Sequence, residues 1–261
     1  SKYKIDFIGF HGQTIFHNSN EKLSKQLGLG KKLSDLTKTT VVYNFRQNDL
    51  KNGGEGAPLA AIYHKLIVMK LVKKRKMKVP AIILNIGGIS NITIVRNYNP
   101  YDFTSRDIGP GNCLIDSWIR KNSEKKFDKD GFLANKGISN EIVLEQAQEL
   151  YSNRPNQNTL SLDVNDFDVS FARGLSLEDG TATLTDFTGH IIGAALLNLL
   201  SNVKEKSFKV LICGGGRKNK SLINVIKKRT LTSTNLQSID DYGIDGDFVE
   251  SQAFAFLAIR S

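Results

Sequence analysis

Short apolar runs that stop at glycines alternate with helical patterns along this chain, and that alternation is what most restricts its fold. Residues 81–86 and 89–95 are rich in β-branched side chains and flank Gly87-Gly88, a pattern that predicts a hairpin. Residues 210–213 form another buried-strand pattern that stops at three glycines before a helical pattern. Strands that alternate with helices predict an α/β fold.

The remaining elements follow from the same periodicities. Residues 5–10 have the composition of a buried strand. Much later in the chain, Asn112 is placed to cap the helix that begins after it. The polar stretch 123–184 predicts loops around a single helix. Further strands are expected at 41–45 and 103–107, and helices at 57–76, 112–120, 140–151, 186–203, 222–228 and 249–259.

Composition excludes several classes of protein. Two cysteines without a CxxC pair cannot build a disulfide framework, and four histidines without ligand spacing argue against a zinc site, so no metal-ligand set is predicted. No apolar run is long enough to cross a bilayer, and the cysteine usage favours the cytoplasm. The net charge of +10 is spread along the chain; its one basic run, residues 73–76, fits a helix C-terminus better than a nucleic-acid site.

Two glycine turns are candidates for phosphate or nucleotide binding. The segment Asn85 to Asn91 contains Gly87, Gly88 and Ser90, where exposed backbone N–H groups and neutral side-chain donors suit a phosphate. An ordinary hairpin turn explains the same residues equally well. The Gly214-Gly215-Gly216 turn follows a strand and allows a flat ring or a phosphate to approach the backbone, although a purely structural turn is as good an explanation.

Two carboxylates lie at positions suited to catalysis. Asp107 closes a strand and precedes Gly109-Pro110-Gly111-Asn112, which leaves space beside a general base. Glu250 lies in the first turn of an apolar helix. Each also has a structural explanation, because Asp107 could cap a turn and Glu250 could complement the helix dipole.

A third group of polar residues suits contact with a sugar or an anion. Arg46 and Asp49 precede a glycine-dense loop, residues 53–56, that leads into a helix. His11 and Gln13 follow a strand, where ligands of open α/β sheets bind. A flexible connection and a structural histidine are the alternatives.

Taken together, and in this order, the segments resemble the anhydro-N-acetylmuramic acid kinase family. The residues that carry the resemblance are 8–14, 41–49, 53–59, 84–91, 107–112, 127–131, 213–219, 241–244 and 249–255. The resemblance implies an actin-like ATPase (ribonuclease H-like) fold of two domains. It also implies ATP-dependent phosphorylation of O6 of 1,6-anhydro-N-acetylmuramic acid, with hydrolytic opening of the anhydro ring to give N-acetylmuramic acid 6-phosphate during cell-wall recycling.

The resemblance also implies roles for particular residues. Asp107 corresponds to the base that activates water, and Glu250 to a second active-site carboxylate. ATP, accompanied by Mg²⁺, is expected at two segments, the phosphate hairpin and the adenosine region. The expected ATP contacts are Asn85, Gly87, Gly88, Ser90, Asn91, Gly214, Gly215, Gly216 and Asn219. The expected contacts to the amino sugar are His11, Gln13, Arg46, Asp49, Gly109, Gly111 and Asn112.

The family's opening Gly-Thr-Ser-x-Asp-Gly phosphate loop has no counterpart in these residues. The first domain, residues 1–78, is therefore expected to be incomplete, with the second spanning 79–261, and the chain alone is expected to lack kinase activity. Another actin-like sugar or acetate-type kinase, or a non-catalytic protein that binds nucleotide or muropeptide, remains an alternative. No nucleic-acid or membrane partner is expected, and a homodimer is left open.

Overall fold

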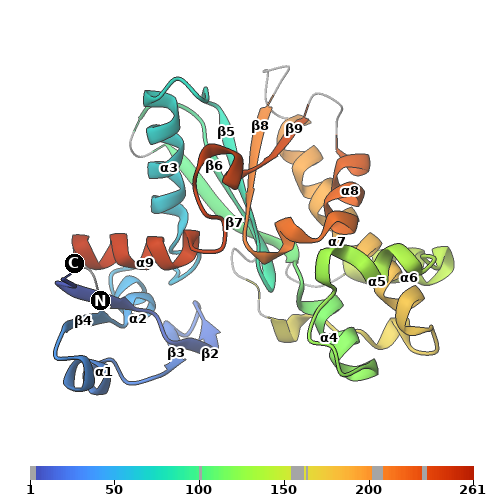
Figure 1. The fold of residues 1–261 in the computed structure, drawn as a ribbon, viewed down its shortest axis with the longest axis horizontal. Coiled ribbons are helices and arrows are strands. Elements are labelled where there is room, and N and C mark those ends of the chain that lie inside the picture. Colours follow the sequence, from blue (N-terminus) through green and yellow to red (C-terminus); the bar gives the residue numbers. More distant parts are fainter. Residues whose placement is uncertain (1–3, 100–101, 154–161, 163, 202–207, 231–233) are drawn as a thin grey trace.

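A five-stranded sheet forms the centre of the protein (Figure 1). The structure, a computed structural model, describes residues 4–99, 102–153, 162, 164–201, 208–230 and 234–261. The strand order is β7-β6-β5-β8-β9. Strand β6 pairs antiparallel with β5 and with β7, whereas β8 pairs in parallel with β5 and with β9. The strands are β5 (Ala81–Ile86), β6 (Ile89–Val95), β7 (Phe103–Pro110), β8 (Phe208–Cys213) and β9 (Thr234–Ser238).

Helices cover both faces of this sheet because its central strands are apolar on both sides. On β5, Leu84 faces a core built with α7 (Leu177–Ser201) and α8 (Lys220–Arg229). Its neighbour Ile83 faces the opposite core, where α3 (Ala61–Lys73) packs. Both side chains are fully buried. This arrangement confirms the α/β class, and the sheet order agrees with the ribonuclease H-like arrangement expected from the resemblance.

A helical lobe packs on the far end of α7, at the lower right of Figure 1. It is built around Trp118, whose indole Nε1 donates to the Leu177 carbonyl oxygen at 3.1 Å. Its helices are α4 (Cys113–Asn122), α5 (Phe132–Lys136) and α6 (Glu141–Ser152). Short 3₁₀ segments are η1 (Lys129–Gly131), η2 (Val164–Asp166), η3 (Ser170–Ala172), η4 (Gly215–Lys218) and η5 (Ile239–Tyr242).

The N-terminal residues form a separate small unit. Its strands β1 (Phe7–Phe10) and β4 (Thr40–Tyr43) pair in parallel, and β2 (Gln13–Asn18) pairs antiparallel with β3 (Leu23–Leu27). Two helices complete it: α1 (Gly30–Thr37) and α2 (Phe45–Lys51).

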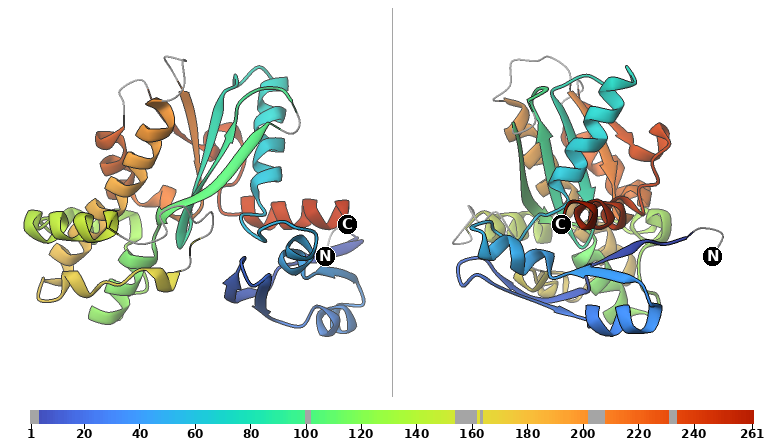
Figure 2. Two further views of the ribbon diagram at one scale, coloured as in Figure 1. Left: turned by 180° about the vertical axis from the view of Figure 1, so that it is seen from behind. Right: turned by 90° about the vertical axis from the view of Figure 1, so that its left-hand side faces the viewer.

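The last described helix, α9 (Val249–Arg260), packs on this small unit although it follows the sheet of the large one. It lies next to β1 in Figure 1, and Figure 2 shows the same arrangement from two further sides. A Cβ added to Gly9 of β1 would lie 2.4 Å from the carbonyl oxygen of Phe254, so strand and helix are in backbone contact. The ring of Phe254 also packs on His11 at 4.3 Å and on Phe45 at 5.5 Å, measured between ring centroids.

Several expectations are corrected. The first strand begins at Phe7 and is not a buried core strand, because Phe7 is 38% exposed and lies in a two-stranded sheet. The helix expected at 186–203 begins earlier, at Leu177, and the 123–184 stretch holds α5 and the start of α7 besides the expected α6. Residues 202 and 203 lie outside the described residues.

The boundary expected at residue 78 differs from the packing. Residues Ile67, Val68 and Leu71 of α3 belong to the same buried core as β5 and β8, so α3 is part of the large unit. By packing, the chain passes from the small unit to the large one ahead of α3 and returns in α9. No helix in the described part of the chain is both long and apolar enough to cross a membrane.

Candidate functional site

Polar side chains form a row across three neighbouring strands of the sheet. In the strand register Asn85 lies opposite Asn91, and Asn91 lies opposite Asp107. The register between β6 and β7 shifts next to this row, leaving Ile108 as an extra residue, and such bulges re-aim the side chains beside them. The buried Oδ1 atom of Asn91 has no hydrogen-bond partner among the described residues, so this oxygen is available to a ligand.

Asp107 is half-buried, and its carboxylate is held from one side. The backbone N–H of Leu162 donates to its Oδ2 at 2.8 Å. Burial raises the pKa of Asp107 to about 6, although the Leu162 hydrogen bond and the positive charge of Arg46 both act to lower it. A carboxylate whose pKa lies near neutrality is suited to take up a proton.

Arg46 of α2 brings the small unit to this carboxylate. Its Nε donates to Nε2 of His11 at 2.8 Å, and one terminal nitrogen donates to the carbonyl oxygen of Gly56 at 2.8 Å. Burial lowers the pKa of Arg46, and the negative charges of Glu250 and Asp107 oppose that effect. Arg46 therefore interacts electrostatically with carboxylates from two other elements, β7 and α9.

His11 acts as a neutral support for Arg46. Because an arginine nitrogen can only donate, Nε2 of His11 must accept, and the ring proton lies on Nδ1, which donates to the Gly12 carbonyl oxygen at 2.7 Å. Burial and the neighbouring Arg46 charge lower the pKa of His11 to about 4. The imidazole therefore stays uncharged at neutral pH and fixes the direction of the guanidinium.

Asp49 and Gln13, which were also expected to contact the sugar, lie in different surroundings. Asp49 shapes the glycine loop, because its Oδ2 accepts from the Gly56 N–H at 2.8 Å and Gly54 packs directly on the carboxylate. Gln13 is exposed at the start of β2 and donates only weakly, to the Thr14 carbonyl oxygen at 3.4 Å.

Gly111 and Asn112 are bound to the Gly87-Gly88 turn. The Gly111 N–H donates to the Gly88 carbonyl oxygen at 2.8 Å, and the Asn112 N–H donates to that of Gly87 at 2.7 Å. Only glycine fits at position 111, because a Cβ there would lie 2.3 Å from the Gly87 oxygen. Asn112 is the N-cap residue of α4, as expected, but its side chain makes no cap hydrogen bond; its Nδ2 instead donates to the Gly87 oxygen at 3.1 Å.

Two more residues of this region serve the packing of the turn. Ser90 is fully buried, and its hydroxyl donates to the Pro110 carbonyl oxygen at 3.1 Å. Gly109 has a φ of 153°, and a Cβ there would lie 2.5 Å from Ile191 of α7. Both hold β7 and the Gly87-Gly88 turn together, which positions Asp107.

The Gly214–Gly216 turn lies against the end of β5. A Cβ on Gly214 would meet Oδ1 of Asn85 at 2.4 Å, and one on Gly216 would meet Ile86 at 2.2 Å. At Gly215 the nearest atom is Nδ2 of Asn112, 3.9 Å away, so this residue faces open space. Asn219, which follows the turn, is buried and caps α8 by accepting from the Leu222 N–H at 3.0 Å.

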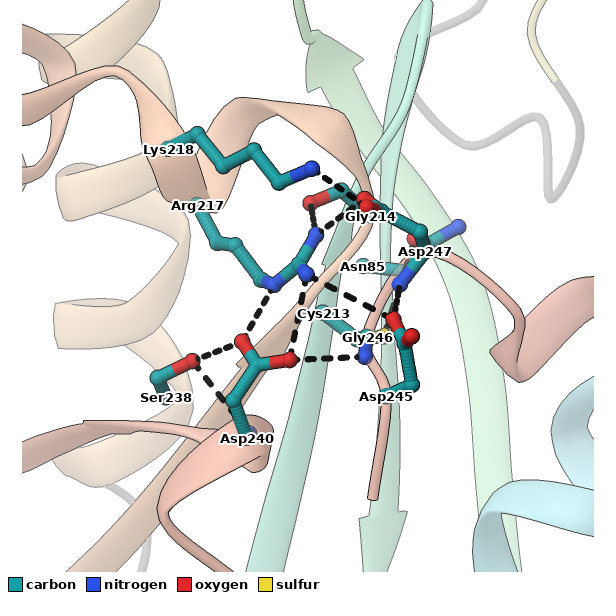
Figure 3. Close-up of polar contacts among 10 residues, drawn as sticks. All are labelled: Asn85, Cys213, Gly214, Arg217, Lys218, Ser238, Asp240, Asp245, Gly246 and Asp247. Carbon is teal, nitrogen blue, oxygen red and sulfur yellow. Dashed lines mark hydrogen bonds and ion pairs between the residues drawn. The ribbon is translucent and has the colours of Figure 1, made fainter. Parts of the chain in front are cut away.

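The sequence reasoning missed two charged residues beside these turns. Asp116 lies one helical turn after Asn112 on α4; burial raises its pKa to about 6, while Arg120 lowers it and Asp128 raises it. Arg217, directly after the glycine turn, contacts several aspartates of residues 240–247 (Figure 3). The density of acidic residues at 240–247 was the available signal for the second.

The family model and the similar sequences all point to the same family. The family model for anhydro-N-acetylmuramic acid kinase matches residues 1–261. A protein of that name from Pelagibacter ubique (strain HTCC1062) is 52% identical over 257 residues, which are 98% of this chain and 68% of that protein. One from Zymomonas mobilis is 36% identical over 98% of this chain and 66% of its own length. The chain thus spans about two thirds of the length of these relatives.

The likeness to solved structures is looser. The activator of the 2-hydroxyisocaproyl-CoA dehydratase from Clostridium difficile, with bound ADPNP, matches with a TM-score of 0.48 and 13% identity, covering 97% of this chain and 92% of that one. Component A of the (R)-2-hydroxyglutaryl-CoA dehydratase from Acidaminococcus fermentans matches with a TM-score of 0.43 and 12% identity, covering 87% of this chain and 72% of that one. The sequence matches, by contrast, run the length of the chain at up to 52% identity, and on them the chain belongs to the anhydro-N-acetylmuramic acid kinase family.

Proposed function

We propose that the protein containing this chain phosphorylates O6 of 1,6-anhydro-N-acetylmuramic acid with ATP and opens the anhydro ring with water. The observation that carries the proposal is that Arg46 of α2 lies within electrostatic reach of two carboxylates from other elements, Asp107 of β7 and Glu250 of α9. The names of the relatives supply the substrate class.

In this mechanism Asp107 takes a proton from water, whose oxygen attacks C1 of the sugar. The bond between C1 and O6 breaks, and O6 takes the γ-phosphoryl group as ADP leaves. The product is N-acetylmuramic acid 6-phosphate, an intermediate of cell-wall recycling. The pKa of Asp107, about 6, keeps this carboxyl ionised at neutral pH while leaving it basic enough to accept the proton.

Arg46 and Glu250 have complementary roles in this proposal. Arg46 is fixed by His11 and Gly56, so its positive charge is oriented before the substrate arrives and can face the developing negative charge. Glu250, exposed in the first turn of α9, is a hydrogen-bond acceptor for sugar hydroxyls. Such fixed groups accelerate a reaction by holding substrate and charge in place.

We place ATP between the Gly87-Gly88 turn and the Gly214–Gly216 turn. The open space at Gly215 and the unpartnered Oδ1 of Asn91 support this placement. Mg²⁺ would neutralise charge on the phosphates. No three His, Cys, Asp or Glu side chains gather into a metal site in the described part of the chain, but Mg²⁺ is usually held by one or two carboxylates together with phosphate oxygens. The unpartnered Oδ1 of Asn91 is the oxygen beside the turn that would fit this chemistry, because Asp107 is needed as the base.

A cytoplasmic location is part of the proposal. Cys113 and Cys213 are both free and buried, as expected of thiols in a reducing compartment. Burial raises the pKa of both, to about 11 for Cys113 and about 12 for Cys213, so neither is a thiolate at neutral pH.

The test uses the complete gene product that contains this chain, purified and supplied with ATP, Mg²⁺ and 1,6-anhydro-N-acetylmuramic acid. We expect release of ADP that depends on this sugar, and reaction in ¹⁸O-labelled water should place the label on C1 of the phosphorylated product. Nucleotide binding without sugar-dependent ADP release would favour a non-catalytic binding protein, and turnover with other sugars or acetate but not this one would favour another actin-like kinase. The 261 residues alone, assayed in parallel, are expected to show no turnover.

The placement of ATP has its own test. The Gly215→Val change adds a side chain where the nearest neighbouring atom is 3.9 Å away, and Gly215 has no left-handed φ to strain, so the variant should fold normally. We expect weaker ATP binding in calorimetry with unchanged binding of the sugar, because the new side chain fills the space assigned to the nucleotide. Equal ATP affinity in variant and parent protein would refute this placement.

A further inference from the structure

Arg217 is the centre of a charged cluster in which the arginine side chain is buried beneath exposed aspartates (Figure 3). Its side chain is 6% exposed, and its Nε and one terminal nitrogen donate to the two carboxylate oxygens of Asp240, at 2.6 Å and 3.1 Å. The other terminal nitrogen donates to Asp247 at 2.6 Å and to the Gly214 carbonyl oxygen at 3.0 Å. Asp245 completes the cluster with an ion pair at 3.9 Å.

This cluster joins two segments that are distant in the sequence. One is the Gly214–Gly216 turn, and the other is the loop of residues 240–248 that leads into α9. A direct backbone bond runs beside the arginine, because the Gly214 N–H donates to the Gly246 carbonyl oxygen at 3.1 Å. The Gly246 N–H in turn donates to Asp240 at 3.0 Å, so the loop is tied both to the turn and to the arginine's main partner.

The loop leads directly into the first turn of α9, which contains Glu250. Asp247, a direct partner of Arg217, lies three residues before Glu250, with the N-cap Phe248 and the buried Val249 between them. Arg217 therefore holds, with one rigid guanidinium, the turn on one side and the start of the helix that carries Glu250 on the other.

We propose that Arg217 is a positioning residue that fixes the Gly214–Gly216 turn and Glu250 relative to each other. The inference rests on the proposed function, in which the turn binds the nucleotide and Glu250 contacts the sugar. The inference goes beyond that function because it makes both the affinity for the nucleotide and the rate of the chemical step depend on Arg217.

The electrostatics of the cluster explain why an arginine is needed. Hydrogen bonds from Arg217 hold the pKa of Asp240 well below its usual range, and the same bonds raise that of Arg217. The cluster therefore stays ionised throughout the working pH range. A lysine carries the same charge but lacks the planar fork that bonds both oxygens of Asp240 and still reaches Asp247 and Gly214.

The test compares Arg217→Met and Arg217→Lys with Arg96→Met in the complete gene product. Arg96 is the matched control, because its ion pair with Asp102 is exposed and lies at the opposite end of the β6–β7 pair. ATP affinity is measured by calorimetry with Mg²⁺ present, and kcat with saturating sugar. We expect both Arg217 variants to bind ATP about tenfold more weakly and to lose kcat by about 10²-fold, as small misplacements of reacting groups do. Arg96→Met should change neither.

A double-mutant cycle separates positioning from general loss of structure. If Arg217 acts on the chemical step through Glu250, Arg217→Met should lower kcat by less than about twofold further once Glu250→Gln is present. A full, multiplicative loss in that background, or unchanged kcat and ATP affinity in a variant that merely melts earlier, would overturn the proposal. Should Arg217→Met fail to fold, Asp247→Asn is the milder substitute.

The proposed function and this inference fail in different ways. A parent protein that releases no ADP with the anhydro sugar contradicts the function, and ATP binding then still tests the support of the turn by Arg217. Turnover in the parent together with ATP affinity that ignores Arg217 contradicts the inference alone.

Discussion

At the scale of single residues, Asp107 is a carboxylate whose environment departs clearly from that of an ordinary surface carboxylate. Burial raises its pKa to about 6, against hydrogen bonding from Leu162 and the charge of Arg46. A base must be deprotonated to act, so activity should fall as the pH drops through about 6 and hold above it. Asp116 has a similarly raised pKa of about 6 but lies on α4 and has no assigned role in the reaction.

We predict that Asp107→Asn lowers kcat by about 10²–10⁴-fold, the usual loss when a general base is removed, and abolishes the acidic limb of the pH–rate profile. Sugar binding should change far less. Asp116→Asn is the matched control and should keep the limb near pH 6. A profile that follows Asp116 rather than Asp107, or near-normal turnover in Asp107→Asn, would remove Asp107 from the mechanism.

The sequence indicated candidate site residues but not the groups that these residues contact. Asp107, Arg46 and Glu250 lie in short segments that resemble the family motifs, but nothing local reveals that Arg46 draws on His11 or that Asp107 accepts from Leu162. Those contacts join segments up to dozens of residues apart. The contacts of Arg217 were missed for the same reason, because charge type alone does not say which of the many acids in a chain an arginine meets.

At the scale of elements, prediction succeeded where the signal was local. The β5–β6 hairpin follows directly from two β-branched runs around Gly87-Gly88. The first turns of α7 were missed because Thr181, Thr183 and Thr185 look like loop or strand residues, yet each is at most 2% exposed. The hydroxyls of Thr181 and Thr183 donate to the carbonyl oxygens four residues earlier, which satisfies them inside the helix.

A buried histidine joins α3 to the sheet. His64 is 1% exposed, and its Nδ1 is 2.8 Å from the hydroxyl of Thr93, which in turn lies 3.0 Å from that of Ser105 on β7. Burial lowers the pKa of His64 to about 4. Between pH 6.5 and pH 4, His64 is therefore protonated in the unfolded chain but not in the folded protein. The stability that His64 contributes is present above pH 6.5 and is lost as the pH falls toward 4.

We predict that His64→Leu flattens the fall in unfolding free energy between pH 6.5 and pH 4, by up to about 3 kcal/mol for a shift of this size. The remaining slope should come from groups such as His11, whose pKa is also lowered to about 4. Urea unfolding at a series of pH values measures the effect. An unchanged slope in the variant would show that His64 is protonated in the folded protein.

At the scale of the whole molecule, the relation between the two units depends on the contact between β1 and α9. Gly9 permits it, because any side chain there would overlap the backbone of Phe254. Arg46 and His11 belong to the small unit, whereas Asp107 lies in the large one and Glu250 on the helix between them. The relative positions of these four residues therefore depend on the contact between β1 and α9.

We predict that Gly9→Ala destabilises the protein by about 1–3 kcal/mol, as overpacking does, and lowers kcat because α9 must move away from β1. Gly174→Ala is the control: it has a left-handed φ of 91° but no atom within 4 Å of an added Cβ, so it should cost about 1–2 kcal/mol of strain without affecting turnover. Thermal unfolding and steady-state kinetics of both variants test this. Normal kcat in a destabilised Gly9→Ala protein would show that the site does not depend on this contact.

The overall architecture illustrates what local patterns leave out. The α/β class follows from the alternation of elements. Residues 5–10, however, were expected to form a buried core strand, and only residues 7–10 form a strand, in a half-exposed two-stranded sheet. Their packing depends on α9, nearly the whole chain away. Similarly, α3 precedes the expected boundary at residue 78 and yet shares the core of the large unit. Periodicity identifies the buried side of a helix but not the sheet that covers it.

The contact between β1 and α9 also sets the order in which the protein can be completed during synthesis. Residues 7–10 leave the ribosome first among the described strands, while the helix that packs on them is the last described element to be made. At a rate of synthesis of about 5–20 residues per second, α9 is made on the order of ten to fifty seconds after β1. During that interval residues 7–10 have no helix to cover them, so the nascent small unit exposes apolar side chains that a chaperone could bind.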